Sequence, residues 1–355
     1  MEIIDCIGTP SARGKIHGET LRDRICDALD RWEAATMAGL GAKAPRSIDQ
    51  YCEEFLSDTE LLQQAQALTP DLVTELYGIA EGAEQPFARM AVYNLMDEQW
   101  WRDADLKSPP PGCSLVAQKV SGGHVLAQNM DLPGHMDGSQ VALRLGGDDI
   151  PETIVLSAAG LLGLTGAKAD GLAVGVNTLL MLQHSASGLP VAFALRHALA
   201  ASNPADAMKR LSSMNHASGQ HYAMVSSDQI LSVECSARST TVVPLEDDAQ
   251  LRHTNHPLAS SDIDPRALKR LGDGGFTKSS ELRLAWLDRH CTEPGSRADV
   301  QVLFDDPTAP LCMRPETNGG SSTFASVLYE LGDTLTVKMR AGVARLNDWS
   351  EFGFN

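Results

Sequence analysis

Gly112 and Cys113 are the residues of this chain whose types and order most directly suggest chemistry. The run Pro109-Pro110-Pro111 precedes them, and a predicted strand begins at Cys113. The Cys113 thiol could add to the Gly112 carbonyl carbon, move the acyl group from nitrogen to sulfur, and leave a thioester for water to hydrolyse. The new chain would begin at Cys113, and its α-amine, with a reference pKa of roughly 7.7–8.0, could act as general base for its own thiol. The pair predicts an autocleavage site; the alternative is an ordinary loop after three prolines.

A second polar group lies on the partner strand of a predicted hairpin. The hairpin turns at Ser121-Gly122-Gly123, and its second strand carries Gln128-Asn129-Met130-Asp131. Because side chains alternate across a sheet, Asn129 and Asp131 share one face, and we expect the hairpin to bring that face to Cys113. Asp131 could then hold the protonation state of the α-amine or orient a substrate. The alternative is a surface Asn and Asp at a strand end.

Two further asparagines could supply an oxyanion hole. Asn177 ends the apolar run 171–176, and Asn255 belongs to His253-Thr254-Asn255-His256-Pro257. A buried amide must use its donors and acceptors, and amides beside a thiol can stabilise a developing oxyanion. For Asn177 the alternative is a turn residue that closes its strand. The two histidines are three positions apart without a third ligand nearby, so we expect no metal and no organic cofactor.

The composition limits the classes of function. The 355 residues carry a net charge of −17, with 43% hydrophobic and 21% charged residues, which is typical of a globular protein. Nucleic acids and anionic membranes attract clustered Lys and Arg, so we expect neither as a partner. We see no signal peptide and no run of roughly 18 apolar residues, and we expect a cytoplasmic protein. The seven widely spaced cysteines include no C-x-x-C pair, which argues against a disulfide framework.

The elements that must position these residues change in pattern near residue 112. From Gly18 to Trp101 apolar residues recur at helical spacing, after a strand expected over residues 2–7. Beyond it we expect strands over 113–120, 124–131, 140–145, 153–157, 171–179, 221–226, 230–235, 240–245, 323–331 and 334–339. We expect helices over 190–201, 204–214, 266–271, 279–290 and 297–304. Strands grouped with strands and helices with helices predict an α+β layered sandwich. We divide the chain into a mainly helical N-terminal segment, residues 1–112, and a catalytic segment, residues 113–355.

Taken together and in this order, the motifs resemble the acyl-CoA:6-aminopenicillanic acid acyltransferase (isopenicillin-N acyltransferase-like) family of Ntn hydrolases. More distantly, the chain is similar to bile salt hydrolases and penicillin V acylases. The resemblance spans nearly the whole chain, and its motifs are 11–19 (SARGKIHGE), Gly112-Cys113, 128–131, 171–177, 253–256, 279–283 (SSELR) and 323–327.

The resemblance implies a four-layer αββα sandwich and self-cleavage before a cysteine, which leaves the two fragments as a heterodimer. This heterodimer could be the whole assembly or part of a higher oligomer. It implies Cys113 as the nucleophile, Asp131 as the Asp of the second strand, and Asn255 as the oxyanion-hole Asn. Asn177 matches the second oxyanion position, and Arg283 resembles the arginine that steadies the thiolate, with an exposed helix charge as its alternative. The family usually has an Asn-Trp-Asp-Trp pattern around the Asp, whereas Met130 and Leu132 flank it here, so the family's β-lactam substrate cannot be transferred to this chain.

We therefore expect an N-terminal cysteine enzyme that cleaves the amide bond of a small molecule through a thioester acyl-enzyme. Hydrolysis comes first because a chain of net charge −17 offers no evident basic site for a CoA nucleotide. The alternative within the same chemistry is an acyltransferase that moves an acyl group from a thioester to an amine. The alternative from another class is an unprocessed scaffold of the same fold without turnover.

Overall fold

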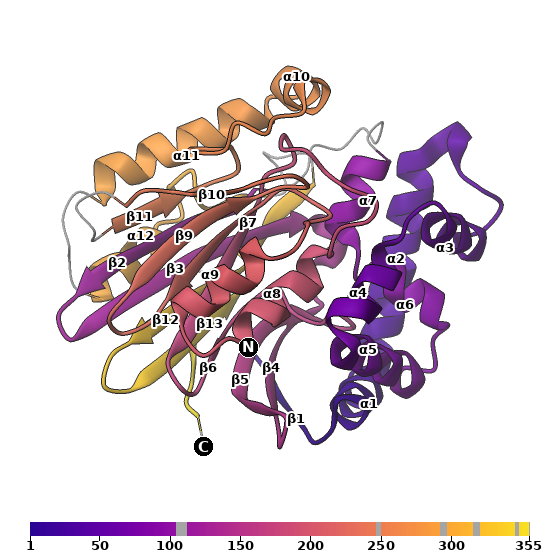
Figure 1. Cartoon of the computed structure of the whole chain (residues 1–355), viewed down its shortest axis with the longest axis horizontal. Helices are drawn as coiled ribbons and strands as arrows, with labels where there is room; N and C mark the ends of the chain where they lie inside the picture. Colours follow the sequence, from indigo (N-terminus) through magenta and orange to yellow (C-terminus); the bar gives the residue numbers. More distant parts are fainter. Residues whose placement is uncertain (104–111, 246–249, 292–296, 315–319, 345–347, 355) are drawn as a thin grey trace.

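The computed structural model of the chain describes residues 1–103, 112–245, 250–291, 297–314, 320–344 and 348–354. The expected proline run, residues 109–111, lies outside the described residues. The first segment begins with strand β1 (Ile3–Ile7) and continues as helices, shown in indigo and purple in Figure 1. These helices are α1 (Pro10–Thr20), α2 (Arg22–Leu40), η1 (Gly41–Lys43), α3 (Ile48–Ser57), α4 (Leu61–Leu68), α5 (Pro70–Gly82), α6 (Phe87–Tyr93) and α7 (Met96–Arg102).

The remaining chain forms two sheets and the helices that cover them. One sheet has the order β1-β4-β5-β6-β7-β8-β9-β10, and the other has the order β11-β2-β3-β12-β13-β14. The strands are β2 (Ser114–Val120), β3 (Gly123–Pro133), β4 (Gln140–Gly147), β5 (Ile150–Ala158), β6 (Thr165–Lys168), β7 (Leu172–Thr178), β8 (Gln220–Val225), β9 (Ile230–Cys235), β10 (Thr240–Val242), β11 (Gln250–His253), β12 (Ser321–Leu331), β13 (Leu335–Ala341) and β14 (Ser350–Phe352). The helices are η2 (Gly134–Met136), α8 (Val191–Leu199), α9 (Pro204–Ser212), α10 (Pro265–Asp273), α11 (Phe276–His290) and α12 (Arg297–Asp305).

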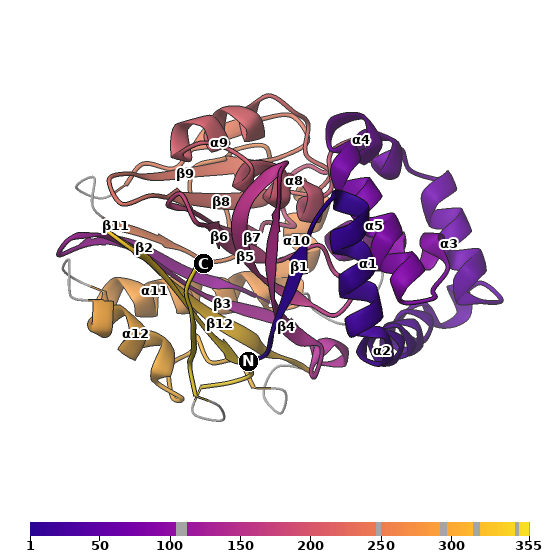
Figure 2. The same ribbon diagram turned by 90° about the horizontal axis from the view of Figure 1, so that it is seen from below.

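These elements stack in four layers, which Figure 2 shows edge-on. Helices α8 and α9 cover the eight-stranded sheet, and helices α11 and α12 cover the six-stranded sheet. The two sheets pack on each other through β2, β3 and β12 on one side and β7 and β8 on the other. The central strand β12 is buried along its whole length because its sheet is covered on both faces, and its buried polar side chains, such as Thr323 and Ser326, hydrogen-bond to β3. The expected α+β fold with a four-layer αββα sandwich is confirmed.

The close packing of α1 on α5 explains why the sequence pattern did not predict α1. Helix α1 lies against α5, and the contact runs through Gly14 and Gly18 on one helix and Gly78 and Gly82 on the other. A Cβ at Gly14 would lie 1.9 Å from the backbone oxygen of Glu75, so only glycine allows the two backbones to come this close. Glycine disfavours helices and carries no apolar signal, and the helical periodicity therefore begins only after α1.

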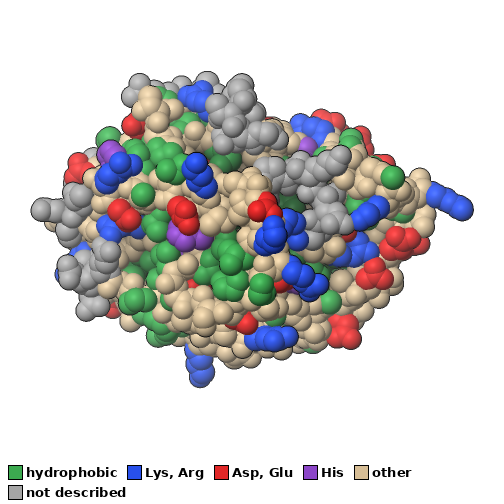
Figure 3. All heavy atoms as spheres, turned by 90° about the horizontal axis from the view of Figure 1, so that it is seen from above, with side chains coloured by type: hydrophobic (Ala, Val, Ile, Leu, Met, Phe, Trp, Pro, Cys, Tyr) green, Lys and Arg blue, Asp and Glu red, His purple; other side chains and the backbone are tan. Residues whose placement is uncertain are grey.

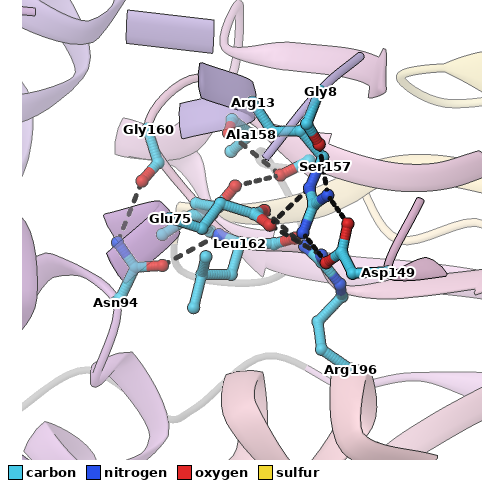
Figure 4. Close-up of polar contacts among 11 residues, drawn as sticks. Gly8, Arg13, Glu75, Asn94, Asp149, Ser157, Ala158, Gly160, Leu162 and Arg196 are labelled. Carbon is cyan, nitrogen blue, oxygen red and sulfur yellow. Dashed lines mark hydrogen bonds and ion pairs between the residues drawn. The ribbon is translucent and has the colours of Figure 1, made fainter. Parts of the chain in front are cut away.

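Residues 1–112 do not form a separate unit. Strand β1 pairs in parallel with β4, which makes the N-terminal segment the edge of the eight-stranded sheet. Figure 4 shows a second junction, where Glu75 of α5 contacts Arg13 of α1 and Arg196 of α8. Arg196 donates to Glu75 Oε1 at 2.8 Å and to Oε2 at 3.0 Å, and Arg13 bonds Asp149 in the β4–β5 turn at 2.7 and 2.8 Å. The segment boundary at residue 112 is thus crossed by a strand pairing and by buried ion pairs.

The expected strands and helices of the catalytic segment are found with small shifts in their ends. The strands β6, β11 and β14 were not expected; β6 is a short stretch that includes Gly166, and glycine weakens a strand pattern. No helix among the described residues combines the length and the apolar character that crossing a membrane requires. On the face seen from above, the described Lys and Arg side chains are scattered among acidic and hydrophobic ones (Figure 3).

Candidate active site

Cys113 stands immediately before β2, in the interior of the sandwich. The β2–β3 register pairs Ser114 with Asn129, so Met130 comes opposite Cys113, and the two sulfur atoms are 3.4 Å apart. The Cys113 side chain is 5% exposed and opens onto a cavity. The described residues that line this cavity are Asn94, Met96, Asp97, Trp100, Cys113, Met130, Asp131, Leu132, Leu161, Gly163, Leu164, Val176, Thr178, Val191, Ala192 and Leu195. A thiol in a mostly apolar cavity can meet the acyl part of a substrate.

The backbone of Cys113 is held by two side chains that come from distant parts of the sequence. The Cys113 backbone N–H donates to Asn255 Oδ1 at 2.7 Å, and Arg283 Nη1 donates to the Cys113 carbonyl at 2.5 Å. Arg283 Nη2 also donates to Asn255 Oδ1, at 2.9 Å. Asn255 Nδ2 donates to the Thr178 carbonyl at 3.0 Å, which leaves its second amide hydrogen for another acceptor. Asn255 and Arg283 thus fix both sides of residue 113.

Helix α11 supplies the residues that hold this arrangement in place. Ser280 Oγ accepts the Asn255 backbone N–H at 2.7 Å and contacts His256 Nδ1 at 2.8 Å, while its carbonyl accepts from Thr254 Oγ1 at 3.1 Å. Arg283 lies one turn further along the same helix. Residues three positions apart share a helix face, so one face of α11 both shapes the loop that carries Asn255 and presents the guanidinium. Arg283 is 1% exposed, which rules out the alternative of an exposed helix charge.

The electrostatics of the site hold the thiol protonated while the chain is uncut. Burial, with the Asp131 carboxylate adding to it, raises the pKa of Cys113 to about 12, although Arg283 opposes the shift. Burial lowers the pKa of Arg283, and Asp131 and Cys113 oppose that change. Burial also raises the pKa of Asp131 to about 7, against the influence of Arg283 and Thr323. A proton acceptor near the thiol is therefore needed before it becomes a strong nucleophile.

Asn129 does not meet Cys113 as the alternation argument expected, and for this residue the expectation is wrong, whereas Asp131 lies close enough to raise the pKa of the thiol. Asn129 donates to the Leu311 carbonyl at 2.8 Å and accepts from Ser326 Oγ at 2.7 Å. The register is the physical reason, because it places Met130 and not its neighbours opposite Cys113. Asp131 accepts from Thr323 Oγ1 at 2.7 Å, and its Oδ2 is buried without a partner among the described residues. It nevertheless lines the same cavity as the thiol.

Asn177 lies on β7, with Val176 and Thr178 of the same strand lining the cavity. Its own side chain does not line the cavity as described; its Oδ1 is 3.0 Å from His221 Nδ1, and its Nδ2 is buried without a partner among the described residues. His221 Nε2 lies 2.8 Å from Ser232 Oγ, and burial lowers the pKa of His221 well below 6.5. A neutral His221 that accepts from Ser232 and donates from Nδ1 satisfies Asn177 Oδ1, and the alternation along β7 points the Asn177 side chain away from the cavity.

His253 and His256 do not form a metal site with other described side chains. No three described His, Cys, Asp or Glu residues are placed to hold a metal ion. His253 Nε2 bonds Glu234 at 2.9 Å and its ring stacks on His221 with 3.7 Å between centroids. Glu234 in turn accepts backbone N–H groups from residues 258–260. His253 and His256 therefore support the region around Asn177 and Asn255 through hydrogen bonds and ring stacking.

The sequence reasoning missed the contribution of α7 to the cavity. Asp97 and Trp100 line it, although both lie in the N-terminal segment. Asp97 is 6% exposed and its neighbour Glu98 is fully buried. The signal was present as two adjacent acids inside an otherwise apolar helical pattern, and buried acids of this kind are frequent at functional sites.

A four-layer αββα sandwich with a buried cysteine at the head of a central strand defines a protein of the Ntn-hydrolase type. The family model described as acyl-coenzyme A:6-aminopenicillanic acid acyl-transferase matches residues 120–344. The chain belongs to this family, and the resemblance seen in the motifs is confirmed.

The chain is also similar to individual proteins. The acyl-coenzyme A:6-aminopenicillanic-acid-acyltransferase 40 kDa form of Emericella nidulans is 26% identical over 343 residues, which cover 95% of this chain and 92% of the relative. Penicillin V acylase from Agrobacterium tumefaciens matches with 12% identity and a TM-score of 0.37, covering 68% of this chain and 86% of its own. A variant of conjugated bile acid hydrolase from Clostridium perfringens matches with 12% identity and a TM-score of 0.40, covering 68% and 97%.

Proposed function

We propose that this protein is an N-terminal cysteine amide hydrolase that activates itself by cleavage between Gly112 and Cys113. The observation that carries the proposal is the set of contacts to the backbone of residue 113 at the proposed cleavage site. Asn255 accepts its N–H, Arg283 binds the next carbonyl, and the thiol of Cys113 opens onto the cavity. Burying the Arg283 guanidinium costs free energy. A loop without a catalytic role would not require a buried charge at its backbone.

In the proposed cleavage the Cys113 sulfur bonds to the Gly112 carbonyl carbon, and the bond from that carbon to the Cys113 nitrogen breaks. The nitrogen takes the thiol proton and becomes a free amine, while Gly112 is held as a thioester. Water then adds to the thioester, which gives the Gly112 carboxylate and restores the thiol. The hydrogen bond from the Cys113 N–H to Asn255 Oδ1 remains available to the new amine, so the amine stays beside its own sulfur.

In the mature enzyme the Cys113 α-amine takes the thiol proton, and the thiolate attacks the substrate carbonyl. The second amide hydrogen of Asn255 stabilises the oxyanion; one missing donor of this kind typically costs about 10²–10³ in rate. Asn177 faces away from the cavity wall that Val176 and Thr178 form, so we assign it a supporting role through His221. The protonated amine returns its proton to the leaving amine as the C–N bond breaks. Water hydrolyses the acyl thioester, and Asp131 and Arg283 set the electrostatic environment of the reacting groups.

The two fragments, residues 1–112 and 113–355, stay together as a heterodimer in this proposal. The β1–β4 pairing and the ion pairs Glu75–Arg196 and Arg13–Asp149 cross the cut, and none of them involves the cleaved peptide. All seven cysteines are free, which suits a reducing compartment, and we propose a cytoplasmic location on this basis.

An acyltransferase is the alternative, because the family and the Emericella nidulans relative are named for acyl transfer from a coenzyme A thioester. The two differ only in whether water or an amine resolves the acyl-enzyme. We favour water because no Lys or Arg is among the described residues that line the cavity, whereas a CoA nucleotide carries several negative charges.

A panel of short acyl amides, N-acyl amino acids and penicillin V, with and without an added acceptor amine, tests the proposal. We expect amine release and a transient acyl adduct on Cys113 by intact mass. New amide formed from an acyl thioester and an amine, without hydrolysis, would favour the transferase. A protein that cleaves itself but forms no acyl adduct with any amide or thioester would contradict both enzymes, and an uncut, inactive chain would support the scaffold.

A further inference from the structure

The cavity beside Cys113 has a charge pattern that self-cleavage does not require. Apart from the nucleophile Cys113, two of its described lining residues can be charged, Asp97 and Asp131, and both are acids; the others are apolar or neutral. Arg283, the cation that lowers the pKa of Asp131, is not in this wall: its Nη atoms bond Cys113, Ser114 and Asn255 instead. A group that enters the cavity therefore meets two carboxyls and no Lys or Arg side chain in the described wall.

Asp97 is fixed in place by neutral donors. Its Oδ2 accepts from Thr178 Oγ1 at 2.7 Å and from Gln220 Nε2 at 2.6 Å. These bonds tie helix α7 to strands β7 and β8, so the carboxyl is held rigidly at the cavity wall with 6% of its residue surface exposed. Burial raises the pKa of Asp97, and the two hydrogen bonds oppose the shift.

Asp131 supplies a second acidic group to the wall. Its Oδ1 is occupied by Thr323, while its Oδ2 is fully buried and has no partner among the described residues. An unsatisfied buried carboxyl oxygen is costly, and a cation or a hydrogen-bond donor brought into the cavity would reduce that cost. A second carboxylate would raise it through desolvation and like-charge repulsion.

We propose, on the basis of the function proposed above, that this cavity is the acyl site and that it selects acyl groups by charge. It accepts apolar acyl groups that are neutral or end in an ammonium, and it rejects acyl groups that carry a carboxylate. The acyl group is the part concerned because it stays bonded to Cys113 Sγ after the amine leaves. Asp97 is the specificity-determining residue, since it lines the wall without taking part in the cleavage of the chain.

The direct test uses three p-nitroanilides of equal chain length, whose acyl groups are hexanoyl, 6-aminohexanoyl and adipoyl. We expect kcat/KM for the first two to exceed that for adipoyl by about a hundredfold, because juxtaposed like charges in a desolvated site are strongly unfavourable. Asp97→Asn, which keeps the shape of the side chain, should narrow this ratio at least tenfold and should lower 6-aminohexanoyl relative to hexanoyl. Glu98→Gln, which removes the neighbouring buried carboxyl outside the cavity wall, should leave the ratio as it is.

Adipoyl turnover equal to hexanoyl, or an unchanged ratio in Asp97→Asn, would overturn the proposal while leaving the amide hydrolase intact. If no anilide is cleaved, the proposed amide hydrolase is wrong, and the charge selection is tested separately by ligand binding. Titration of the Cys113→Ala protein with hexan-1-ol, hexylamine and hexanoate should then show hexanoate as the weakest ligand. Binding of hexanoate as tight as that of hexan-1-ol, or no binding of any of the three, would overturn the charge selection.

Discussion

Arg283 occupies the space in which a side chain on Gly112 would lie. A Cβ built on Gly112 would come within 2.3 Å of Arg283 Nη2 and 3.0 Å of Asn255 Oδ1. The buried guanidinium reaches the backbone at residue 113 because residue 112 has no side chain. Glycine at this position is thus explained by the close approach of Arg283, in addition to the access that it gives to the carbonyl carbon.

The first prediction follows from this contact. Gly112→Ala should slow self-cleavage at least tenfold, because the added methyl group displaces the guanidinium from the Cys113 carbonyl, and a displacement of about 1 Å near reacting groups can cost two orders of magnitude. The fraction of cut chain is followed over time by denaturing gel electrophoresis. Gly272→Ala is the matched control, since a Cβ there meets nothing within 4 Å. Cleavage of Gly112→Ala at the wild-type rate would show that the contact has no role.

The second prediction concerns the ion pairs that join the two segments. Glu75 is buried between Arg13 and Arg196 (Figure 4), and the two arginines lower its pKa although burial opposes them, Arg196 more strongly than Arg13. Glu75→Gln should lower the free energy of unfolding by about 3–5 kcal/mol, because it leaves the buried Arg196 guanidinium without its carboxylate, while Arg13 keeps Asp149 as a partner. Urea denaturation of the uncut Cys113→Ala chain measures this change.

Glu81→Gln serves as the control for that measurement. Glu81 pairs with Lys15 at 2.7 Å on the surface, where both side chains are largely exposed, and such pairs contribute about 1 kcal/mol or less. Equal effects of the two substitutions would contradict the view that the buried pairs hold the fragments together. In the cut wild-type protein, we expect Glu75→Gln to promote separation of the fragments at low concentrations of denaturant.

The third prediction concerns pH and Glu98. Burial, with Asp97 adding to it, raises the pKa of Glu98 to about 8 from a reference value of 4.5. The folded chain therefore keeps a proton that the unfolded chain loses above pH 4.5, so the stability associated with this group is fully present below that pH and is lost as pH rises through 8. The loss is at most about 1.4 kcal/mol per pH unit for one proton.

Glu98→Gln cannot titrate and should remove this part of the pH dependence. Between pH 5.5 and 8, its free energy of unfolding should fall less than that of the parent, with both measured by urea denaturation in the Cys113→Ala background. Gln can retain the hydrogen bond from Ser218 Oγ, which Glu98 accepts at 2.8 Å. Parallel curves for the two proteins would show that Glu98 ionises normally in the fold.

The sequence pattern was informative where the physical signal is local. The turn residues Ser121-Gly122-Gly123 between two short β-like runs predict the β2–β3 hairpin, and Cys113, Asn255 and Arg283 can be proposed as site residues from the sequence. The contacts themselves depend on packing between segments about 140 to 170 positions apart, and no local pattern contains that information. The family resemblance, and not periodicity, selected Arg283.

The remaining errors have physical causes. Asn129 was assigned to the wrong face because register is set by the whole hairpin, and a shift of one residue reverses every side chain. Asp97 was overlooked because its role depends on α7 lying against the mouth of the sandwich, a tertiary arrangement. Asn177 was correctly expected to be buried, but its partner His221 comes from the adjacent strand β8 and could not be paired with it from spacing alone.

The most direct test of the account is the N-terminal sequence and intact mass of active wild-type protein. We predict two polypeptides, of 112 and 243 residues, with the second beginning at Cys113, and a single full-length chain without activity for Cys113→Ala. An active preparation in which every molecule remains one chain of 355 residues would contradict it, because no α-amine would then exist at Cys113 to accept the thiol proton.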